Sequence, residues 1–448
     1  MASLTKTLIR LGTALIPVKS VRRRVRKNFM DRERDARFAR DLPKVRARYA
    51  EHERSCREKL ARGEKVSVAF LVCDASMFSG ESVFMRLKDD PRFTCTIAVA
   101  PRVTRGEAFL RDTLAKTVKT LSQRYGDAVR ALYDPETKKS EPLAADIIFS
   151  TILYEDQTLP DYTTERLSRT SLVAILYYGY GGLFICNERK TPFLPNVVFS
   201  WRYFVSNAAT REMNLAKNPR LDANIVVSGY AKMDRMEELR VKRGEAGKNG
   251  TRRKKVIICP HHTIDKEADG LAISTFLTHA DLFLKLPEMF PEIDFVFRPH
   301  PILFPRLATA KWWGEERTAA YRAKMESFPN VEFQQGGDYF ASFVDSDAMI
   351  HDCGSFLAEY FYTGHPQCYL LESERTVTEQ FLPVSRRLLE HAFKAYTGDQ
   401  IVDFIRKVVI DEDDPRKTER DAFAAREVCV NHPHATEAVI AAVESVLA

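Results

Sequence analysis

The chain has 448 residues, of which 45% are hydrophobic and 29% charged, and its formal net charge is +7. This length suggests two or three domains, each able to bury a substantial core. No run of 18 apolar residues occurs and residues 1–30 lack a secretory pattern, so we expect neither a membrane-spanning helix nor an export signal.

The placement of charge and cysteine narrows the class of protein further. Basic residues crowd residues 1–65 and 240–255, which favours a local anionic partner and argues against a nucleic-acid-binding protein. The eight scattered cysteines include no C-x-x-C pair, so we expect buried thiols in a reduced, cytoplasmic protein, without disulfides or structural zinc.

Residues 1–65 are predicted to form a basic, amphipathic helical extension. Apolar residues share one helix face at Leu4, Leu8, Leu11 and Leu15, and Pro17 separates them from six cations: Lys19, Arg22, Arg23, Arg24, Arg26 and Lys27. Such a segment suits the anionic inner face of a bacterial membrane, where each cation contributes about 1 kcal/mol. The alternative is a solvated helix that packs on its own domain. RNA binding is disfavoured because no aromatic residues are interleaved.

Residues 66–239 are predicted to form a first α/β unit. Helical patterns, such as that of residues 107–125, alternate with short apolar strands at 66–72, 94–99, 146–150, 172–177 and 224–228. The first strand, VSVAFLV, is almost continuously apolar, as expected for a parallel strand buried on both faces. The alternation predicts a parallel sheet covered by helices on both sides.

Residues 240–255 are rich in glycine and basic residues and are predicted to be a linker loop. The same alternation then restarts over residues 256–448. We expect strands at 256–259, 293–297, 331–333, 347–351 and 367–371. We expect helices at 272–290, 315–327, 355–363, 376–395, 398–409, 418–428 and 435–447. Two doubly wound units of this kind place a cleft between the carboxyl ends of their sheets.

Chemistry-bearing residues of the second unit follow its strands. His261 and His262 come after the first strand, and Arg298 and His300 come after the second. Because the carboxyl ends of parallel strands share one edge of a sheet, we expect these residues to lie on one rim. The arginine can clamp phosphate oxygens, and a histidine can accept the proton of an attacking hydroxyl or donate to a phosphate.

A third segment, SDAMIHDCGSFLAEY, is predicted to be a strand, a tight turn and a helix. Asp352, Gly354 and Ser355 form the turn and are candidate donor-binding residues, because free backbone N–H groups at the helix start suit a phosphate. Glu359 lies one helical turn after Ser355, where its carboxylate can accept hydrogen bonds from ribose hydroxyls.

Metal and cofactor chemistry are not expected. The histidines lack H-x-x-x-H or C-x-x-C spacing, and adjacent histidines point apart on an extended chain, so we predict no metal site. No Walker, G-x-G-x-x-G, G-x-S-x-G or D-x-D motif is present. The sequence therefore lacks the motifs that usually indicate kinases, dehydrogenases, serine hydrolases and metal-dependent single-sheet glycosyltransferases.

In the first unit, LYYGYGGLF follows a strand. Tyr178, Gly179 and Tyr180 are therefore candidates for an acceptor side of the cleft, the alternative being a relaxed turn with core tyrosines.

Four segments resemble the CDP-glycerol glycerophosphotransferase family, the teichoic-acid-polymerase-like enzymes: SGYAKMD, PHHT, RPHP and SDAMIHDCGSFLAEY. The resemblance covers residues 225–372 best. It implies a two-lobed GT-B fold in which the carboxyl-terminal lobe holds the nucleotide and no metal is required. By position, it implies that Arg298 and His300 contact the donor diphosphate, that Gly354 and Ser355 bind phosphate, and that Glu359 holds the ribose.

One departure from the family concerns the catalytic base. The family's W-H-G motif, whose histidine is the proposed base, corresponds here to Tyr177, Tyr178 and Gly179. A base drawn from His261 or His262 is the alternative.

The resemblance implies a transferase at the cytoplasmic face of a bacterial membrane. It would move a glycerophosphate, another polyol phosphate or a sugar from a nucleotide-activated donor to a hydroxyl of an envelope glycan or its lipid-linked precursor. Two alternatives remain open at this point: a UDP-sugar epimerase or glycosyltransferase of the same fold, and a non-catalytic nucleotide-sugar-binding scaffold.

Overall fold

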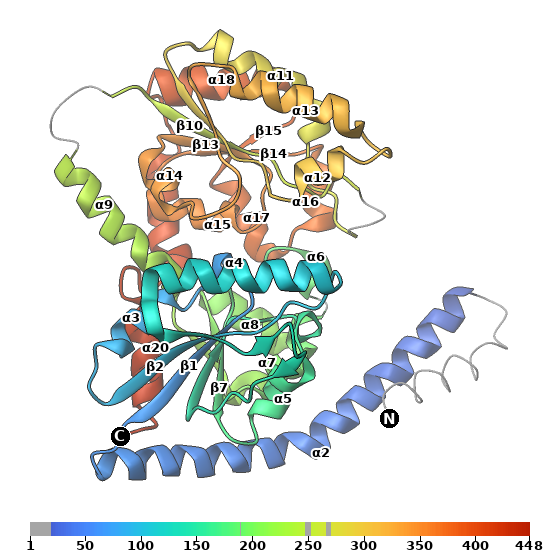
Figure 1. Cartoon of the computed structure of the whole chain (residues 1–448). Helices are drawn as coiled ribbons and strands as arrows, with labels where there is room; N and C mark the ends of the chain where they lie inside the picture. The colour runs from blue at the N-terminus through green and yellow to red at the C-terminus, as the bar shows by residue number, and fades with distance from the viewer. Residues whose placement is uncertain (1–18, 189, 247–251, 266–269) are drawn as a thin grey trace.

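The computed structural model describes residues 19–188, 190–246, 252–265 and 270–448. Two lobes are stacked one on the other, with the carboxyl-terminal lobe uppermost in Figure 1. Each lobe is built on one parallel sheet, of seven strands in the first lobe and six in the second. The prediction of two doubly wound α/β units is confirmed.

The sheet of the amino-terminal lobe has the order β3-β2-β1-β6-β7-β8-β9. Its strands are β1 (Val66–Val72), β2 (Phe93–Val99), β3 (Val129–Ala131), β6 (Ile147–Ser150), β7 (Leu172–Leu176), β8 (Arg202–Val205) and β9 (Ile225–Val227). Alternate residues of β1 enter two separate hydrophobic clusters, so both faces of the strand are buried. This double burial explains the continuous apolar run in its sequence. The short strands β3 and β8 were not predicted.

Helices cover this sheet on both sides (Figure 1). The principal ones are α3 (Glu81–Lys88), α4 (Glu107–Tyr125), α5 (Thr164–Leu167), α6 (Ile185–Glu188), α7 (Pro195–Phe199) and α8 (Ala208–Lys217). A small antiparallel hairpin of β4 (Tyr133–Asp134) and β5 (Lys139–Ser140) lies outside the main sheet.

The sheet of the carboxyl-terminal lobe has the order β12-β11-β10-β13-β14-β15. Its strands are β10 (Lys255–Cys259), β11 (Asp294–Phe297), β12 (Val331–Phe333), β13 (Ala348–His351), β14 (Gln367–Leu370) and β15 (Phe393–Ala395). Its principal helices are α11 (Phe276–Met289), α12 (Leu303–Leu307), α13 (Gly314–Glu326), α14 (Phe340–Asp345), α15 (Phe356–Glu359), α16 (Glu374–Gln380), α17 (Pro383–Glu390), α18 (Gly398–Asp403) and α19 (Lys417–Phe423).

Two predictions about secondary structure were wrong. The expected helix 376–395 is instead two helices, α16 and α17, followed by strand β15. Pro383 starts α17, where its fixed φ is tolerated, and β15 pairs with β14. The expected linker 240–255 is helical over its first residues, because α9 spans Asp234–Ala246.

The last helix returns to the first lobe. Helix α20 (Ala435–Glu444) buries Ala435, Val439 and Val443 in the hydrophobic cluster of the amino-terminal sheet. The carboxylate of Asp234 accepts hydrogen bonds from the backbone N–H groups of Ala435 and Thr436, at 3.4 and 2.6 Å, and so caps the start of α20. The last helix of the predicted second unit therefore packs on the first lobe.

Helix α2 (Lys19–Ala61) runs beneath the amino-terminal lobe, and its first part extends beyond the lobe (Figure 1). Its second part buries Phe38, Leu42, Val45 and Tyr49, which share one helix face, against the lobe. The expected helix over residues 4–16 lies outside the described residues. In the part of the chain that the structure describes, no helix has the length and apolarity needed to cross a membrane.

Candidate active site between the lobes

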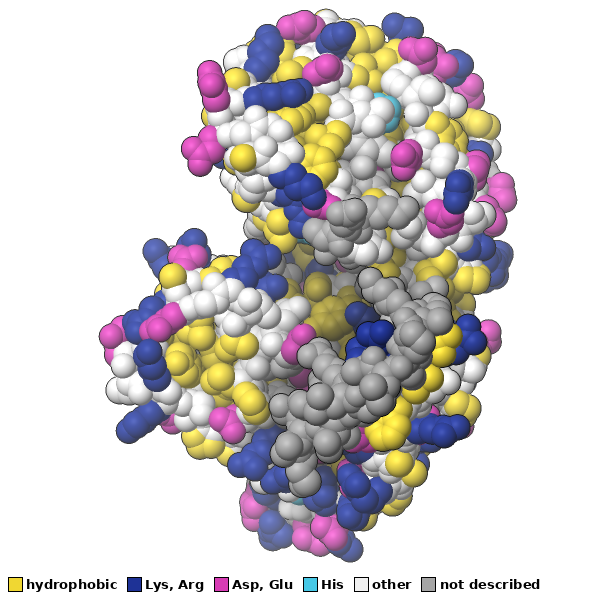
Figure 2. All heavy atoms as spheres, turned by 90° about the vertical axis from the view of Figure 1, so that its right-hand side faces the viewer, with side chains coloured by type: hydrophobic (Ala, Val, Ile, Leu, Met, Phe, Trp, Pro, Cys, Tyr) yellow, Lys and Arg dark blue, Asp and Glu magenta, His cyan; other side chains and the backbone are white. Residues whose placement is uncertain are grey.

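A cleft of about 590 Å³ lies between the lobes, and residues of both lobes line it. Figure 2 shows the surface hollowed where the lobes meet. Most of the predicted site residues line this cleft: Tyr178, Tyr180, His261, His262, Arg298, His300, Gly354, Ser355 and Glu359. Asp352 and Gly179 do not line it.

The order of the strands explains why these residues meet. In the carboxyl-terminal sheet the chain runs outward from β10 to β11 and β12, then crosses back to β13 on the other side of β10. The loops after β10 and β13 therefore diverge at a topological switch point, where open α/β sheets bind ligands. The loop after β10 carries His261 and His262, and the loop after β13 carries Gly354 and Ser355.

The three histidines form one cluster on the rim. The ring centroids of His261 and His262 are 4.3 Å apart, and those of His262 and His300 are 4.1 Å apart. The expectation that the adjacent histidines point apart was wrong, because the loop that carries them is not extended. It turns at this point, where the backbone N–H of Ile264 donates to the carbonyl of His262 at 2.9 Å.

Burial keeps two of these rings, those of His261 and His300, uncharged. Burial lowers the pKa of His300 to about 3, with the nearby His262 and Arg306 adding to the effect, and burial lowers the pKa of His261 well below its ordinary value. Near neutral pH, His261 and His300 are therefore neutral and act as hydrogen-bonding groups rather than as cations.

Arg298 is at the cleft but already has partners. Its guanidinium donates to the side chain of Gln334 at 2.7 Å and to the carbonyls of Gly336 and Gly337 at 2.8 and 2.7 Å. Its side chain is buried and it holds the loop that follows β12 against the rim. The remaining guanidinium N–H groups are what it can offer to a phosphate.

The turn at Gly354 and Ser355 faces the other lobe closely. A Cβ atom at Gly354 would lie 2.7 Å from the ring of Phe184, so only glycine fits beneath this ring. A Cβ atom at Gly179 would lie 3.1 Å from Oγ of Ser355. Helix α15, which begins after Ser355, is only four residues long and passes into a 3-10 turn (Tyr360–Thr363). The glycine therefore serves close approach of the two lobes.

Glu359 is buried at the floor of the cleft, with 1% of its side chain exposed. Its carboxylate accepts hydrogen bonds from the hydroxyls of Tyr230 at 3.0 Å and Tyr339 at 2.5 Å, and Nζ of Lys232 lies 3.7 Å away. Tyr230 and Lys232 belong to the SGYAKMD segment of the first lobe, so this carboxylate joins the two lobes.

Asp352 lies beneath the rim with no exposed surface. Its carboxylate accepts hydrogen bonds from the backbone N–H groups of His261 and Thr275, and burial raises its pKa to about 6. Asp352 thereby links the loop that carries His261 and His262 to the start of α11. Its position suits a positioning residue rather than the direct donor contact that the sequence predicted.

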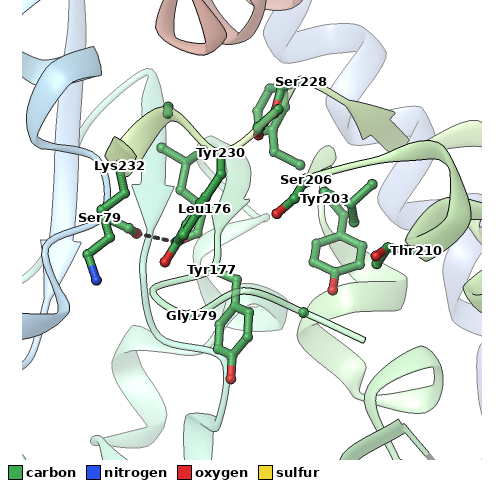
Figure 3. Close-up of a pocket in the computed structure, with 15 residues that line it drawn as sticks. Ser79, Leu176, Tyr177, Gly179, Tyr203, Ser206, Thr210, Ser228, Tyr230 and Lys232 are labelled. Carbon is green, nitrogen blue, oxygen red and sulfur yellow. Dashed lines mark hydrogen bonds between the residues drawn. The ribbon is translucent and has the colours of Figure 1, made fainter. Parts of the chain in front are cut away.

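The wall of the cleft that comes from the amino-terminal lobe was only partly predicted. Tyr177, which follows β7, and Tyr203, which lies in the neighbouring strand β8, extend in the same direction, as Figure 3 shows, and both line the cleft. Gly179 borders a smaller pocket of about 30 Å³ behind the loop, and Lys232 lies at the side of that pocket (Figure 3). Tyr203 was missed because its strand, β8, was not recognised.

Comparison with known proteins identifies the fold. No protein-family model matches the chain, and no curated protein matches it. Among solved structures, it is similar to the wall teichoic acid polymerase TagF, with 14% identity, a TM-score of 0.57 and coverage of 93% of this chain and 97% of that chain.

Two UDP-GlcNAc 2-epimerases are also similar. For the enzyme from Neisseria meningitidis the identity is 14%, the TM-score 0.53 and the coverage 85% of this chain and 100% of that chain. For the enzyme from Methanocaldococcus jannaschii the corresponding values are 10%, 0.52, 85% and 99%. The topology and these likenesses together establish that the chain has the two-lobed GT-B fold.

Proposed function

We propose that the protein is a transferase that moves a glycerophosphate, another polyol phosphate or a sugar from a nucleotide-activated donor to an acceptor hydroxyl. The acceptor would be a bacterial envelope glycan or its lipid-linked precursor. The TagF-like fold supports a transferase that acts on a nucleotide-activated substrate, and the four sequence segments favour a CDP-linked donor.

The observation that carries the proposal is the convergence at the switch point. Loops separated by about a hundred residues bring His261, His262 and Ser355 to one edge of the carboxyl-terminal sheet. This edge faces a cleft whose opposite wall comes from the other lobe. Such a site holds a donor against one lobe and presents an acceptor from the other, which aligns the two reactants before the reaction.

Each group has a role in the transfer of a glycerophosphate. The acceptor oxygen forms a bond to the phosphorus of the glycerol phosphate, and the bond from that phosphorus to the oxygen of CMP breaks. CMP leaves with the bonding electrons. His261 or His262 accepts the proton of the acceptor hydroxyl. His300 and the free N–H groups of Arg298 donate to the phosphate oxygens, where charge develops.

Glu359 is proposed to hold the donor ribose. In the structure its carboxylate is shared by two tyrosine hydroxyls, one from each lobe. Ribose hydroxyls would replace one of these donors, so that donor binding exchanges one hydrogen bond for another without leaving the buried carboxylate unpaired.

A direct assay tests this function. The purified chain is incubated with CDP-glycerol, CDP-ribitol, UDP-GlcNAc or UDP-glucose, with and without a lipid-linked glycan acceptor, and the release of CMP or UDP is followed. We expect acceptor-dependent release that falls by at least about a hundredfold in His300→Asn, the scale on which loss of one oxyanion donor acts. His434→Asn, at a largely exposed histidine outside the cleft, is the matched control. Release that is equal in both variants would contradict the proposal.

An epimerase is the second candidate. The absence of a histidine at Tyr178 and the coverage of the whole N. meningitidis epimerase favour it. It requires no acceptor, so its signature in the same assay is conversion of UDP-GlcNAc alone, with no stimulation by the glycan. A scaffold that does not catalyse transfer would bind a nucleotide and release nothing with any acceptor.

We also propose that α2 binds the anionic inner face of the bacterial membrane. Val21, Val25 and Phe29, spaced by four residues, are 43%, 41% and 50% exposed, and the cations Arg24 and Lys27 beside them are exposed too. An exposed apolar stripe flanked by cations matches an anionic lipid surface.

Vesicle flotation tests this membrane contact. We expect the chain to float with phosphatidylglycerol vesicles and not with phosphatidylcholine vesicles, and the double variant Val25→Glu/Phe29→Glu to lose this binding. Met289→Glu, an exposed apolar residue of the other lobe, is the control and should bind as the wild type does. Equal flotation of the double variant and the control would contradict the proposal.

A further inference from the structure

The histidine cluster has the geometry of a metal-binding site. One ring nitrogen from each of His261, His262 and His300 lies within 4.8 Å of the other two. The ring centroids of His261 and His300 are 5.1 Å apart, which completes a compact triangle. All three rings line the cleft, so an ion bound to them would be reached from solvent and from a ligand in the cleft.

The ligand type of the cluster suits a transition-metal cation. Imidazole nitrogens bind zinc, copper, iron and nickel, and three of them are gathered here. Two charged groups of opposite sign contact the backbone of this loop: Arg306 donates to the carbonyl of His262 at 2.9 Å, and Asp352 accepts from the backbone N–H of His261.

Hydrogen bonds with neighbouring groups orient the rings of His261 and His300. Nδ1 of His261 lies 2.9 Å from Oγ1 of Thr263, and the backbone N–H of Thr263 donates to the same Nδ1 at 3.4 Å. Metal binding at Nε2 needs a proton on Nδ1, which keeps the contact with the Thr263 hydroxyl and gives up the longer backbone hydrogen bond. The backbone N–H of Ile302 donates to Nδ1 of His300 at 3.2 Å. Metal binding at Nε2 of His300 needs a proton on Nδ1, so this one long hydrogen bond to Nδ1 would be lost.

We propose that His261, His262 and His300 together bind one divalent transition-metal ion, with zinc the best match to three imidazole ligands. Three protein ligands leave a fourth position open, as in catalytic rather than structural zinc sites. The open position faces the cleft. A ring whose lone pair binds the ion cannot also accept the proton of an acceptor hydroxyl, so the ion-bound cluster is a state separate from the roles given to these histidines in the transfer. The ion-binding site does not rest on the proposed function.

The experiment measures metal binding without nucleotide. The full-length chain is stripped with a chelator and dialysed, and Zn²⁺ binding is followed by calorimetry and Co²⁺ binding by the visible absorption of the bound ion. We expect one ion per chain and a cobalt spectrum of low coordination number. Affinity should fall by at least about a hundredfold in His262→Ala and by about ten- to a hundredfold in Thr263→Val, which removes the partner of His261.

Two controls distinguish loss of the metal-binding site from loss of the folded structure. His434→Ala should bind the ion as the wild type does, and the unfolding temperature of each metal-free variant should match that of the wild type. Absence of stoichiometric binding, or equal affinity in His262→Ala and His434→Ala, would overturn the proposal. Nucleotide binding is measured separately in the presence of chelator, so that failure of the metal site and failure of the donor site give different results.

Discussion

At the scale of single residues, the close contact of Gly229 with a neighbouring segment shows how one position shapes the cleft. Gly229 has a φ of +82°, and a Cβ atom there would lie 2.1 Å from the carbonyl oxygen of Val430. The residue lies in the SGYAKMD segment, just before Tyr230, which reaches Glu359. This glycine thus allows the carboxyl-terminal segment to pass directly over the loop that completes the cleft.

Gly229→Ala is predicted to destabilise the protein strongly. The substitution adds left-handed strain of about 1–2 kcal/mol and a clash with backbone that cannot move aside, so the free energy of unfolding should fall by more than about 3 kcal/mol. Gly314→Ala is the matched control, because Gly314 has a φ of +75° with no atom near the added Cβ, and should show the strain alone. Urea unfolding measures both; equal losses would show that the contact with Val430 is unimportant.

His351 predicts a defined dependence of stability on pH. Burial lowers its pKa to about 4, although Gln367 hydrogen-bonds the ring at 2.8 Å. Between pH 4 and 6.5 only the unfolded chain binds this proton, so its contribution leaves stability unchanged above pH 6.5 and lowers it as the pH falls from 6.5 to 4.

The test compares pH profiles of unfolding. His351→Gln removes the titrating group and should flatten the slope of unfolding free energy against pH in that window by up to one proton, about 1.4 kcal/mol per pH unit. His434→Gln, at a largely exposed side chain, is the matched substitution with which this change is compared. A wild-type slope in His351→Gln would mean that this histidine titrates normally in the folded protein.

At the scale of elements, the cleft is held in place by caps and contacts between segments far apart in the sequence. Asp234 at the start of α9 caps α20, some two hundred residues later. The loop from Tyr180 to Phe184 packs into the hydrophobic cluster of the other lobe, where the carbonyl of Leu183 accepts a hydrogen bond from the backbone of Leu382 at 3.1 Å. The lobes are thus joined at the floor of the cleft as well as by the chain itself.

Asp234→Ala should loosen α20. The substitution removes the acceptor for two backbone N–H groups at the start of that helix, so the free energy of unfolding should fall by about 1–2 kcal/mol. Asp234→Asn keeps a side-chain oxygen and should cost much less. Hydrogen exchange of the backbone amides of α20 gives the local readout. Unchanged exchange in Asp234→Ala would show that packing alone holds the helix.

At the scale of the whole molecule, much of the architecture was predictable and the contacts between lobes were not. The strands β1, β10 and β13 are buried on both faces and therefore read as continuous apolar runs. Strand β15 is only three residues long and was absorbed into a neighbouring helical pattern.

The residues of the site also divide into those that were predictable from the sequence and those that depend on contacts between the lobes. His261, His300 and Ser355 were predicted because each follows a recognisable strand and parallel strands share an edge. The engagement of Glu359 by Tyr230 and the closeness of Phe184 to Gly354 were beyond prediction, because they depend on how two separate sheets are placed relative to each other. The closeness of His261 and His262 depends on a local turn that spacing alone does not reveal.

The central claim is that a nucleotide-activated donor binds at the switch point of the carboxyl-terminal sheet, and a thermal-shift panel tests it most directly. CDP-glycerol, CDP-ribitol, CMP, UDP-GlcNAc, UDP-glucose and GDP-mannose are compared on the wild type, on Ser355→Asp and on Ser373→Asp. Ser373 is exposed at the start of α16, outside the cleft, so its variant adds the same charge away from the site.

A ligand at a hundred times its Kd stabilises the folded state by about 2.7 kcal/mol. We predict that a cytidine diphosphate donor raises the unfolding temperature of the wild type and of Ser373→Asp, and that the shift disappears in Ser355→Asp while its temperature without ligand is unchanged. Stabilisation by a UDP-sugar alone would favour the epimerase instead. No shift with any nucleotide, or an equal shift in both variants, would contradict a donor site at this edge of the sheet.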